Sequence, residues 1–425
     1  MSDKKAFLKD LVLNVKEKLA FNKDMSKPYL GLEHLPSSGA NFIDIGTASD
    51  SISSNNVFKS GDVLFGKLRP RLKKCIQVNF DGYCSTDILV LRAYPVVCSK
   101  YAGKVLQSDY VFNEAIRTEE GTKMPRTSWR SIKEIEVFTP PLPQQRKIAK
   151  ILTTVDNLIE KTEALIAKYQ SIKQGMMHDL FTRGIDAKGK LRPPQSEAPE
   201  LYKQSELGWI PKDWEVERLE NHLDRIDQGW SPDCDSEPAT AGEWGVLKTT
   251  AVVWNGFNDL ENKKLPKHLK PEPKYEVKVN DVLMTRGGPN SRVGVVVFVN
   301  ETRSRLMLSD KIYRISLKQS VLPNYIALAL SSKSTQIHLS TLKTGLAESQ
   351  TNISQKIVKQ LLVSIPNLKE QFIICKNIRK TEDFLNSNSR TLLEWKTIKT
   401  ALMQDLLTGK VQVTPDAEDK ELAHA

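Results

Sequence analysis

The stretch Met177-His178-Asp179-Leu180-Phe181-Thr182 returns 226 positions later as Met403-Gln404-Asp405-Leu406-Leu407-Thr408. The pair Gln144-Gln145 returns as Glu370-Gln371 at the same spacing, and each pair follows a proline that ends an expected strand. Two segments of nearly forty residues therefore align without a gap, as is expected when the length of a segment matters. A repeat of this kind predicts the architecture before any local feature does.

Each repeated segment is expected to form one long helix. Between residues 145 and 182 there is no proline, and the only glycine is Gly175. Apolar residues recur three and four positions apart, which indicates a heptad seam buried against another helix. The seam residues are Ile148, Ile151, Val155, Leu158, Thr162, Leu165, Tyr169, Ile172 and Met176, and then Ile374, Ile378, Thr381, Leu385, Asn388, Leu392, Trp395, Leu402 and Leu406. We expect the two helices to pair antiparallel, each about 57 Å long at ~1.5 Å per residue.

The regions before the two helices also match, but less regularly. Lys59-Ser-Gly-Asp62-Val-Leu corresponds to Lys278-Val-Asn-Asp281-Val-Leu at a spacing of 219 residues. Ser85-Thr86-Asp87 corresponds to Leu308-Ser309-Asp310 at a spacing of 223 residues. Because the spacing drifts, the loops of these regions must differ in length. The chain therefore alternates a variable domain with a spacer of fixed length.

The expected fold class is α+β: two mixed α/β domains, separated by two long helices that form an antiparallel coiled coil, in a pseudo-twofold internal repeat. The first domain covers 1–143, with a helix at its N-terminus, and the first long helix covers 144–183. A linker at 184–206 leads to the second domain at 207–369. The second long helix covers 370–409, and a flexible tail follows at 410–425.

The composition favours an anionic partner. The chain has 425 residues, with 62 Lys and Arg against 51 Asp and Glu, which gives a net charge of +11. No apolar stretch approaches the ~20 residues of a membrane helix, and charged residues interrupt the first twenty positions. The five cysteines and six histidines are dispersed, so no metal site is expected. An odd number of cysteines fits a reducing compartment, and we expect a cytoplasmic protein.

Motifs for catalysis are missing from the sequence. There is no glycine-rich dinucleotide fingerprint after a strand and no Asn/Asp-Pro-Pro-aromatic motif of amino-methyltransferases. Gly184-Ile-Asp-Ala-Lys-Gly189-Lys190 resembles a phosphate-binding loop, but it follows an expected helix, and Leu191 replaces the Ser or Thr that would hold magnesium. We therefore expect no enzymatic activity and no cofactor of its own.

Basic residues cluster after the expected Asp-Val-Leu strand of each domain. Lysines suit phosphates, and arginines can also donate two hydrogen bonds to guanine O6 and N7. The alternative is an ordinary solvated basic surface, which recurrence in both halves disfavours for the pair around Arg69 and Arg286. The candidate DNA-binding residues are Lys67, Arg69, Arg71, Lys73, Lys74, Lys123, Arg126, Arg130, Lys248, Lys263, Lys264, Arg286 and Arg292.

Several motifs together resemble the specificity subunits of type I restriction–modification systems. They are Pro140-Pro-Leu-Pro-Gln-Gln-Arg-Lys-Ile148, Met177-x-Asp-Leu-Phe-Thr182, Leu207-Gly-Trp-Ile-Pro-x-x-Trp214 and Gly61-Asp-Val-Leu64. As a set they cover nearly the whole chain. One departure is Gln144, which stands where the family usually has Glu, as Glu370 does in the second copy. This departure is expected to change a capping or partner contact and not the assignment.

The resemblance implies two target-recognition domains, each binding half of a split site in double-stranded DNA. It also implies docking of two modification subunits, which carry the S-adenosylmethionine chemistry. Restriction subunits would add ATP-driven translocation and cleavage, so ATP and magnesium are expected on partner subunits. Two other functions remain open on the residues alone: a non-enzymatic helical scaffold that binds acidic proteins, and a nuclease with an unrecognised site.

Overall fold

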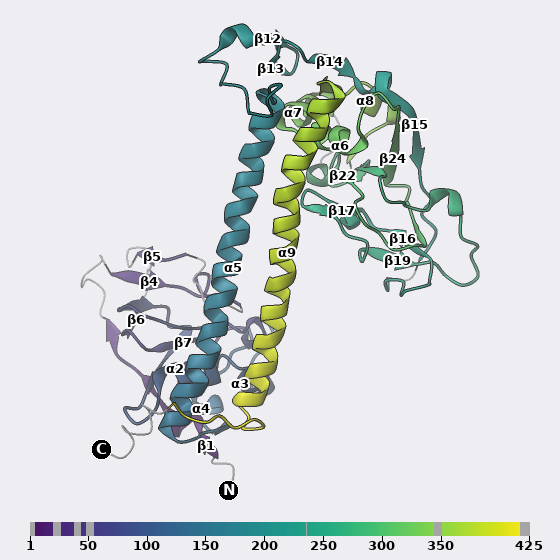
Figure 1. The fold of residues 1–425 in the computed structure, drawn as a ribbon. Coiled ribbons are helices and arrows are strands. Elements are labelled where there is room, and N and C mark those ends of the chain that lie inside the picture. The colour runs from purple at the N-terminus through teal and green to yellow at the C-terminus, as the bar shows by residue number, and fades with distance from the viewer. Residues whose placement is uncertain are drawn as a thin grey trace. The chain divides into compact units, whose positions relative to one another are not determined.

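The computed structural model describes residues 5–19, 27–37, 44–47, 55–234, 236–343 and 351–416. The chain divides into two compact units, Met1–Ala167 with Ser387–Ala425, and Lys168–Asn386. Each unit holds one mixed domain together with part of each of the two long helices, α5 (Leu142–Thr182) and α9 (Leu368–Leu406) (Figure 1). We call them the first and second unit, and their domains the first and second domain.

The first domain has a four-stranded antiparallel sheet in the order β2 (Val12–Val15), β10 (Ile88–Ala93), β7 (Val63–Gly66) and β8 (Cys75–Gln77). Because side chains alternate along a strand, Val63 and Phe65 of β7 enter one core and Leu64 enters another. The first core is closed by α2 (Ser99–Leu106), α3 (Asp109–Arg117), the start of α5 and the end of α9.

The second core of this domain lies under a five-stranded sheet. Its order is β3 (Lys18–Leu19), β6 (Asn55–Phe58), β9 (Gly82–Cys84), β4 (Pro28–Leu30) and β5 (Gly46–Thr47). Leu30, Phe58 and Cys84 of this sheet pack against Leu64 of β7. The four-stranded sheet is therefore buried on both faces, which explains its almost continuous run of apolar residues.

The helix expected at the N-terminus is only the short α1 (Leu8–Leu11), between two strands. Before it, β1 (Lys5–Phe7) pairs with β11 (Glu136–Phe138), and after it β2 pairs with β10. The apolar spacing of this segment fits a helix, but pairing with distant strands satisfies its backbone instead. The expectation of an N-terminal helix was wrong except for this single turn.

The second domain repeats the same topology. Its four-stranded sheet has the order β15 (Leu223–Gln228), β24 (Ile312–Leu317), β20 (Val282–Thr285) and β22 (Val296–Phe298). The helices α6 (Pro323–Ser331) and α7 (Lys333–Leu342) close one core. A three-stranded sheet of β19 (Asn262–Lys264), β16 (Gly245–Leu247) and β23 (Leu306–Met307) contributes to cores on the other side. The predicted fold class is confirmed.

The smaller elements repeat too. The pair β1–β11 has its counterpart in β14 (Glu215–Arg218) and β26 (Leu362–Ile365). The short helix α4 (Trp129–Ile132) has its counterpart in α8 (Gln355–Lys359). Three short pairings belong to the second domain: β12 (Tyr202–Ser205) with β13 (Gly208–Pro211), β17 (Val252–Val253) with β18 (Gly256–Phe257), and β21 (Gly287–Gly288) with β25 (Thr351–Asn352).

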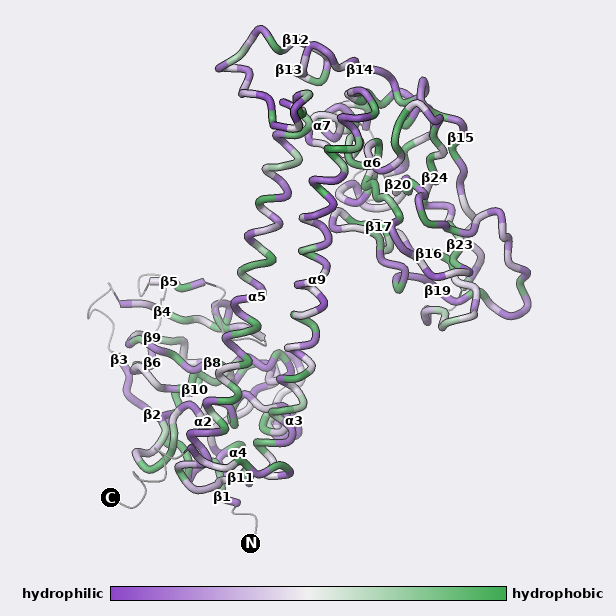
Figure 2. Tube along the Cα trace, in the orientation of Figure 1, coloured by the Kyte–Doolittle hydropathy of each residue, from purple (hydrophilic) through white to green (hydrophobic). Residues whose placement is uncertain are grey.

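The two long helices pair antiparallel within each unit. In the second unit Tyr169 lies against Phe384, with ring centroids 4.1 Å apart, and Lys173 forms an ion pair of 2.7 Å with Glu382. In the first unit Lys396 pairs with Glu163 at 2.8 Å. Along these pairs the residue numbers on α9 decrease as those on α5 increase. The two helices therefore run antiparallel, as expected. Both helices alternate polar and apolar residues along their length (Figure 2).

The segments that follow the two long helices are both held in place. After α5, the buried Arg192 of the predicted linker pairs with Glu370 at the start of α9. After α9, Asp416 pairs with Lys147 at 2.5 Å and with Lys150 at 2.9 Å, both near the start of α5. The tail was expected to be flexible from residue 410, but residues 410–416 make these specific contacts. Residues 417–425 lie outside the described residues.

No described helix combines the length and the apolar composition needed to cross a membrane.

Candidate nucleic-acid interface

Lys67 is fixed at a junction of three segments of the first domain. It follows β7, and its backbone N–H donates to the carbonyl of Asp87, which precedes β10, at 2.8 Å. Its own carbonyl accepts from the N–H of Thr127, just before α4, at 3.0 Å. These two bonds bring the end of a strand, the start of its neighbour and a short helix together at one edge of the sheet.

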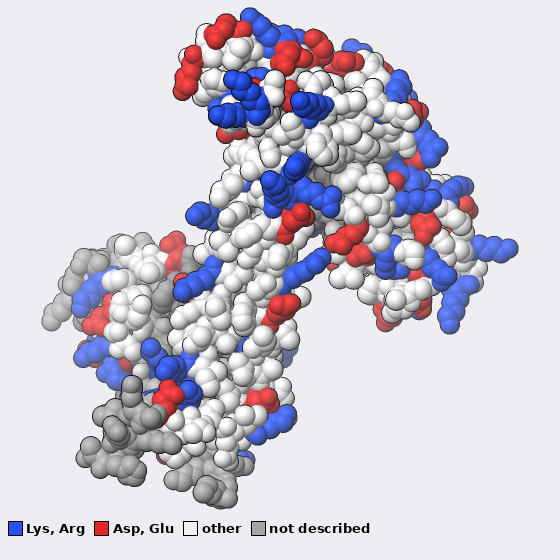
Figure 3. Space-filling model, in the orientation of Figure 1, with Lys and Arg blue, Asp and Glu red and all other residues white. Residues whose placement is uncertain are grey.

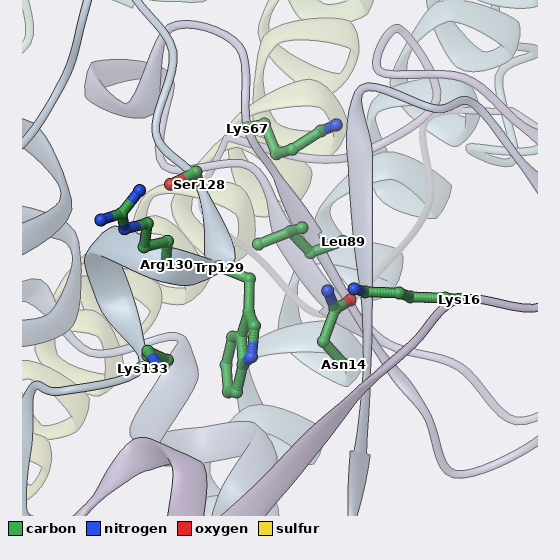
Figure 4. A pocket seen from close by; sticks show the side chains of 8 residues that line it. All are labelled: Asn14, Lys16, Lys67, Leu89, Ser128, Trp129, Arg130 and Lys133. Carbon is green, nitrogen blue, oxygen red and sulfur yellow. The ribbon is translucent and has the colours of Figure 1, made fainter.

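A hollow of about 420 Å³ opens beside this junction (Figure 4). Trp129 forms one of its sides, and Lys16 and Lys67 approach it from different strands (Figure 4). The complete lining is Asn14, Lys16, Lys67, Leu89, Ser128, Trp129, Arg130 and Lys133.

The lining of the hollow contains four cationic side chains and no carboxylate. Lys133 pairs with the neighbouring Glu134 at 3.5 Å. Lys16, Lys67 and Arg130 form no ion pair with any residue that the structure describes. Unpaired cations beside an indole ring and an amide suit a nucleic acid, which offers phosphates to the cations and flat bases to the ring.

Other predicted cations of the first domain are held by acidic partners. Arg71 pairs with Glu119 at 2.8 Å and Lys73 with Asp109 at 2.5 Å. Arg126 approaches Asp87 at 3.3 Å. These three must exchange a partner before they bind a phosphate, so their charge is less available than that of Lys67.

Three further candidates complete the first domain. The ammonium of Lys74 donates to the carbonyl of Leu32 and is therefore engaged. Arg69 and Lys123 are exposed and have no acidic partner within the described ranges. Arg69 adopts a left-handed backbone conformation with φ of 51°, in the short turn that follows Lys67. The structure thus separates available cations from engaged ones within a single basic loop.

Arg286 is the counterpart of Lys67 in the second domain. Its N–H donates to the carbonyl of Lys311 at 2.8 Å, and its carbonyl accepts from the N–H of Ile353 at 2.9 Å. The backbone pattern therefore pairs Arg286 with Lys67, and not with Arg69 as the sequence suggested. The guanidinium carbon lies 5.3 Å from the ring centroid of Tyr313, and Nη1 donates to the carbonyl of Asp310 at 3.3 Å.

The remaining candidates of the second domain also divide into two groups. Lys264 pairs with Glu243 at 2.5 Å, and Lys248 lies 4.0 Å from Glu261. The hydrogen bond from Lys264, helped by two from Thr240, lowers the pKa of Glu243 to about 2, so the carboxylate stays charged near neutral pH.

Lys263 and Arg292 are exposed and lack an ion-pair partner in the part of the chain that the structure describes. Lys263 is the direct neighbour of the paired Lys264 on β19. On the face drawn in Figure 3, basic and acidic side chains of the second unit are interspersed, which agrees with this mixture of paired and unpaired cations.

Sequence reasoning missed Asn14, Lys16 and Lys133 of the hollow. Asn14 and Lys16 lie at the end of β2, in the segment that was expected to be helical, and that expectation hid their place beside Lys67. In the structure Asn14 pairs with β10 as Ile226 pairs with β24, so this strand belongs to the internal repeat. The sequence matches begin only at Lys59 and Lys278 and therefore gave no signal for it.

The described residues contain no group of three or more His, Cys, Asp or Glu side chains that could hold a metal ion. The structure describes all five cysteines, and no disulfide joins any of them. Burial raises the pKa of Cys375 to about 12, so this thiol stays protonated and unreactive near neutral pH.

Comparisons with known proteins agree with this architecture. The model of the type I restriction modification DNA specificity domain matches residues 7–169 and 211–394. The specificity subunit of the type I restriction enzyme EcoEI from Escherichia coli is 40% identical over 207 residues, which are 48% of this chain and 33% of that protein. The MjaVIII specificity subunit from Methanocaldococcus jannaschii is 23% identical over 91% of this chain and 86% of its own length.

A solved structure has the same fold. The crystal structure of a type I restriction–modification S subunit from M. genitalium aligns with a TM-score of 0.62 at 14% identity, covering 97% of this chain and 96% of that one. The family model matches once in each half, as the internal repeat requires. The chain therefore belongs to the family of type I restriction–modification DNA specificity subunits.

Proposed function

We propose that this chain selects the DNA sequence on which a type I restriction–modification complex acts. Its first domain, within residues 1–143, binds one half of a split site, and its second domain, within 207–369, binds the other half. The paired helices α5 and α9 set the gap between the two half-sites and dock the modification subunits. The preferred gap follows from helix length, which is why the repeat has no insertion there.

The observation that carries this proposal is the repeated cation directly after β7 in the first domain and directly after β20 in the second. Lys67 and Arg286 occupy equivalent positions, each held by the same two backbone hydrogen bonds. Around Lys67 the hollow adds cations without carboxylates. Contacts to phosphates fix the orientation of a protein on duplex DNA, whereas contacts to base edges carry the sequence information. A repeated positive anchor with different surroundings fits two DNA half-sites of different sequence.

The chain itself is not an enzyme. In this proposal two modification subunits bind S-adenosylmethionine and transfer the methyl group, and restriction subunits use ATP and magnesium for translocation and cleavage. The chain contributes no cofactor and acts in the cytoplasm, where it meets the DNA. Its positive charge attracts the duplex and speeds association, while the recognition loops determine where the complex stops.

Sequencing of methylated adenines in a host with and without the gene tests the proposal. We expect one bipartite motif, with two defined halves and a gap of fixed length, to be methylated only when the gene is present. An unchanged methylation pattern in a host that expresses the complete complex would contradict it.

Binding measurements separate the proposed function from other roles of a basic protein. The full chain with its modification subunits should bind a duplex that carries the motif more tightly than a scrambled one, with affinity that falls steeply as salt rises. A scaffold for acidic proteins would show no sequence preference. A nuclease would cut DNA as a pure chain in the presence of magnesium, which we do not expect.

A further inference from the structure

The guanidinium of Arg286 is held rigidly, unlike that of a solvent-exposed arginine. It lies over the ring of Tyr313, whose side chain is 2% exposed, and Nη1 donates to the carbonyl of Asp310. The backbone on both sides is fixed by the hydrogen bonds to Lys311 and Ile353. The cation–π contact and the hydrogen bond together restrict the orientation of the group.

Part of this rigid group has no partner. Nε is buried without a hydrogen bond, and Nη2 makes none to any described residue. Because Nε is buried, it is closed to an external ligand, but Nη1 keeps a second hydrogen and Nη2 keeps two. A guanidinium that is restrained in this way can donate to two acceptors with little loss of conformational entropy.

The backbone next to Arg286 is kept free of side chains. Gly287 and Gly288 form β21, which pairs with Asn352 and Thr351 of β25. A Cβ added to Gly287 would lie 2.4 Å from the side-chain oxygen of Asn352, and Gly288 has φ of 140°, which other residues rarely adopt. The two positions that follow Arg286 thus bear no side chain that could cover it.

The equivalent residue of the first domain has a different chemistry. Leu89 occupies the position that Tyr313 has in the second domain, so the neighbouring strand offers Lys67 no aromatic ring, and the ammonium is a point charge without a fixed plane. A flexible ammonium suits a phosphate, which accepts from many directions. A guanidinium with restricted orientation suits the two acceptors on the major-groove edge of guanine, O6 and N7, which lie in one plane.

We propose that Arg286 recognises a guanine in the half-site of the second domain by donating two hydrogen bonds to its O6 and N7 atoms. Lys67, at the equivalent position, contacts a phosphate and carries no sequence information. This inference rests on the proposed function, because it assigns one residue of that DNA-binding surface its ligand.

The test combines a protein variant with a modified base in a double-mutant cycle. The full chain, assembled with its modification subunits, is measured against duplexes in which each guanine of the second half-site is replaced in turn by 7-deazaguanine, which lacks the N7 acceptor. For the native protein we expect one position at which this replacement weakens binding about tenfold or more. Arg286→Lys keeps the charge but donates from a single nitrogen, so the same replacement should then have a clearly smaller effect.

Two controls keep the result interpretable. Arg225→Lys changes an exposed arginine of the same domain, which pairs with Asp227, and should leave the tenfold difference intact. Lys67→Ala should weaken binding to every duplex alike. Because the modified bases probe the native protein directly, the test stands even if Arg286→Lys lowers the melting temperature.

The outcomes distinguish the inference from the function beneath it. If the native complex shows no sequence preference, the proposed function fails. If it prefers its motif but tolerates 7-deazaguanine at every position, or if Arg286→Lys keeps the full sensitivity, Arg286 is a structural or phosphate-binding residue. In that case the inference is wrong while the proposed function stands.

Discussion

The two copies agree in the contacts that join each domain to its long helix. Gln145 and Gln371 are both buried, 3% and 1% exposed. Each side-chain amide donates to a proline carbonyl five residues earlier, at 2.8 and 2.9 Å. Each side-chain oxygen accepts from the backbone N–H at the start of a domain helix, at 3.0 and 2.9 Å. In each copy one glutamine, in the first turn of the long helix, thus binds the segment before that helix and the start of a domain helix.

The residue immediately before each glutamine differs between the copies. Glu370 is buried and accepts from Arg192, which also pairs with Asp213. The side chain of Gln144 donates one long hydrogen bond of 3.4 Å to the carbonyl of Val413 and has no other partner among the described residues. The glutamine contacts between each domain and its long helix are therefore the same in both copies. The contacts to the segment that follows each long helix differ between the copies.

Exchange of a whole domain should change the methylated motif more than any single substitution does. Because each domain has its own cores, replacing 1–143 by the corresponding domain of another family member should change one half of the methylated motif completely. The other half and its methylation should persist. Sequencing of methylated adenines measures both halves at once. A change in both halves would show that the domains do not bind DNA independently.

Among the single substitutions, Glu370→Ala should lower the free energy of unfolding the most. Glu370→Ala leaves the buried Arg192 with the half-exposed Asp213 as its acidic partner among the described residues, and we expect a cost of about 3 kcal/mol in the free energy of unfolding. Gln144→Ala should cost less than about 1 kcal/mol, since its hydrogen bond is long. Urea unfolding of the two variants gives both values.

A double variant checks the cause of that difference. Replacing Arg192 by Met together with Glu370→Ala removes the unpaired charge, so stability should recover in part. If Glu370→Ala and Gln144→Ala cost the same, the buried ion pair is not what distinguishes the two copies.

Periodic and local features were predictable from the sequence, and contacts between distant residues were not. The seam predicted both long helices, and the repeated Asp-Val-Leu stretches predicted β7 and β20. The second helix of each domain, α3 and α7, begins where the side chain of Ser108 or Ser332 caps it. Such a cap is a local signal that helical spacing alone hides.

The candidate interface shows why the remainder was out of reach. Whether a cation is available depends on acidic partners far along the chain, such as Glu119, which lies 48 residues from Arg71. No spacing rule connects such residues. The cation–π contact of Arg286 with Tyr313 likewise depends on how two strands pair, and only the structure supplies that register.

The ion pairs between the long helices allow a sharper comparison of the two copies. Asp156 is 6% exposed and pairs with Lys399 of α9 and with Lys104 of α2. Glu382, at the matching position of α9, is 30% exposed, and Lys173 is its one ion-pair partner among the described residues. Asp156→Ala should therefore lower the free energy of unfolding by about 2–3 kcal/mol, and Glu382→Ala by less than about 1 kcal/mol.

Thermal unfolding in low and high salt would measure this difference. The cost of Glu382→Ala should shrink as salt rises, because an exposed pair is screened, while that of Asp156→Ala should change little. Equal costs would mean that the ion pair of Lys104 with Asp156 adds nothing to the stability of the contact between the first domain and α5.

The smallest expected effect concerns two adjacent lysines of β19, one unpaired and one paired. Lys263 is exposed, whereas Lys264 forms its ion pair with Glu243 at 2.5 Å. If Lys263 contacts a phosphate, Lys263→Gln should reduce the slope of log affinity against log salt by about 0.9, the contribution of one phosphate contact. Lys264→Gln should leave the slope unchanged, because its charge is already compensated within the domain.

Measuring both slopes on the same duplex cancels differences in sequence and length. Equal slopes for the two variants would show that an internal ion pair does not remove a lysine from the interface, and the division of the cations into available and engaged groups would then have to be abandoned.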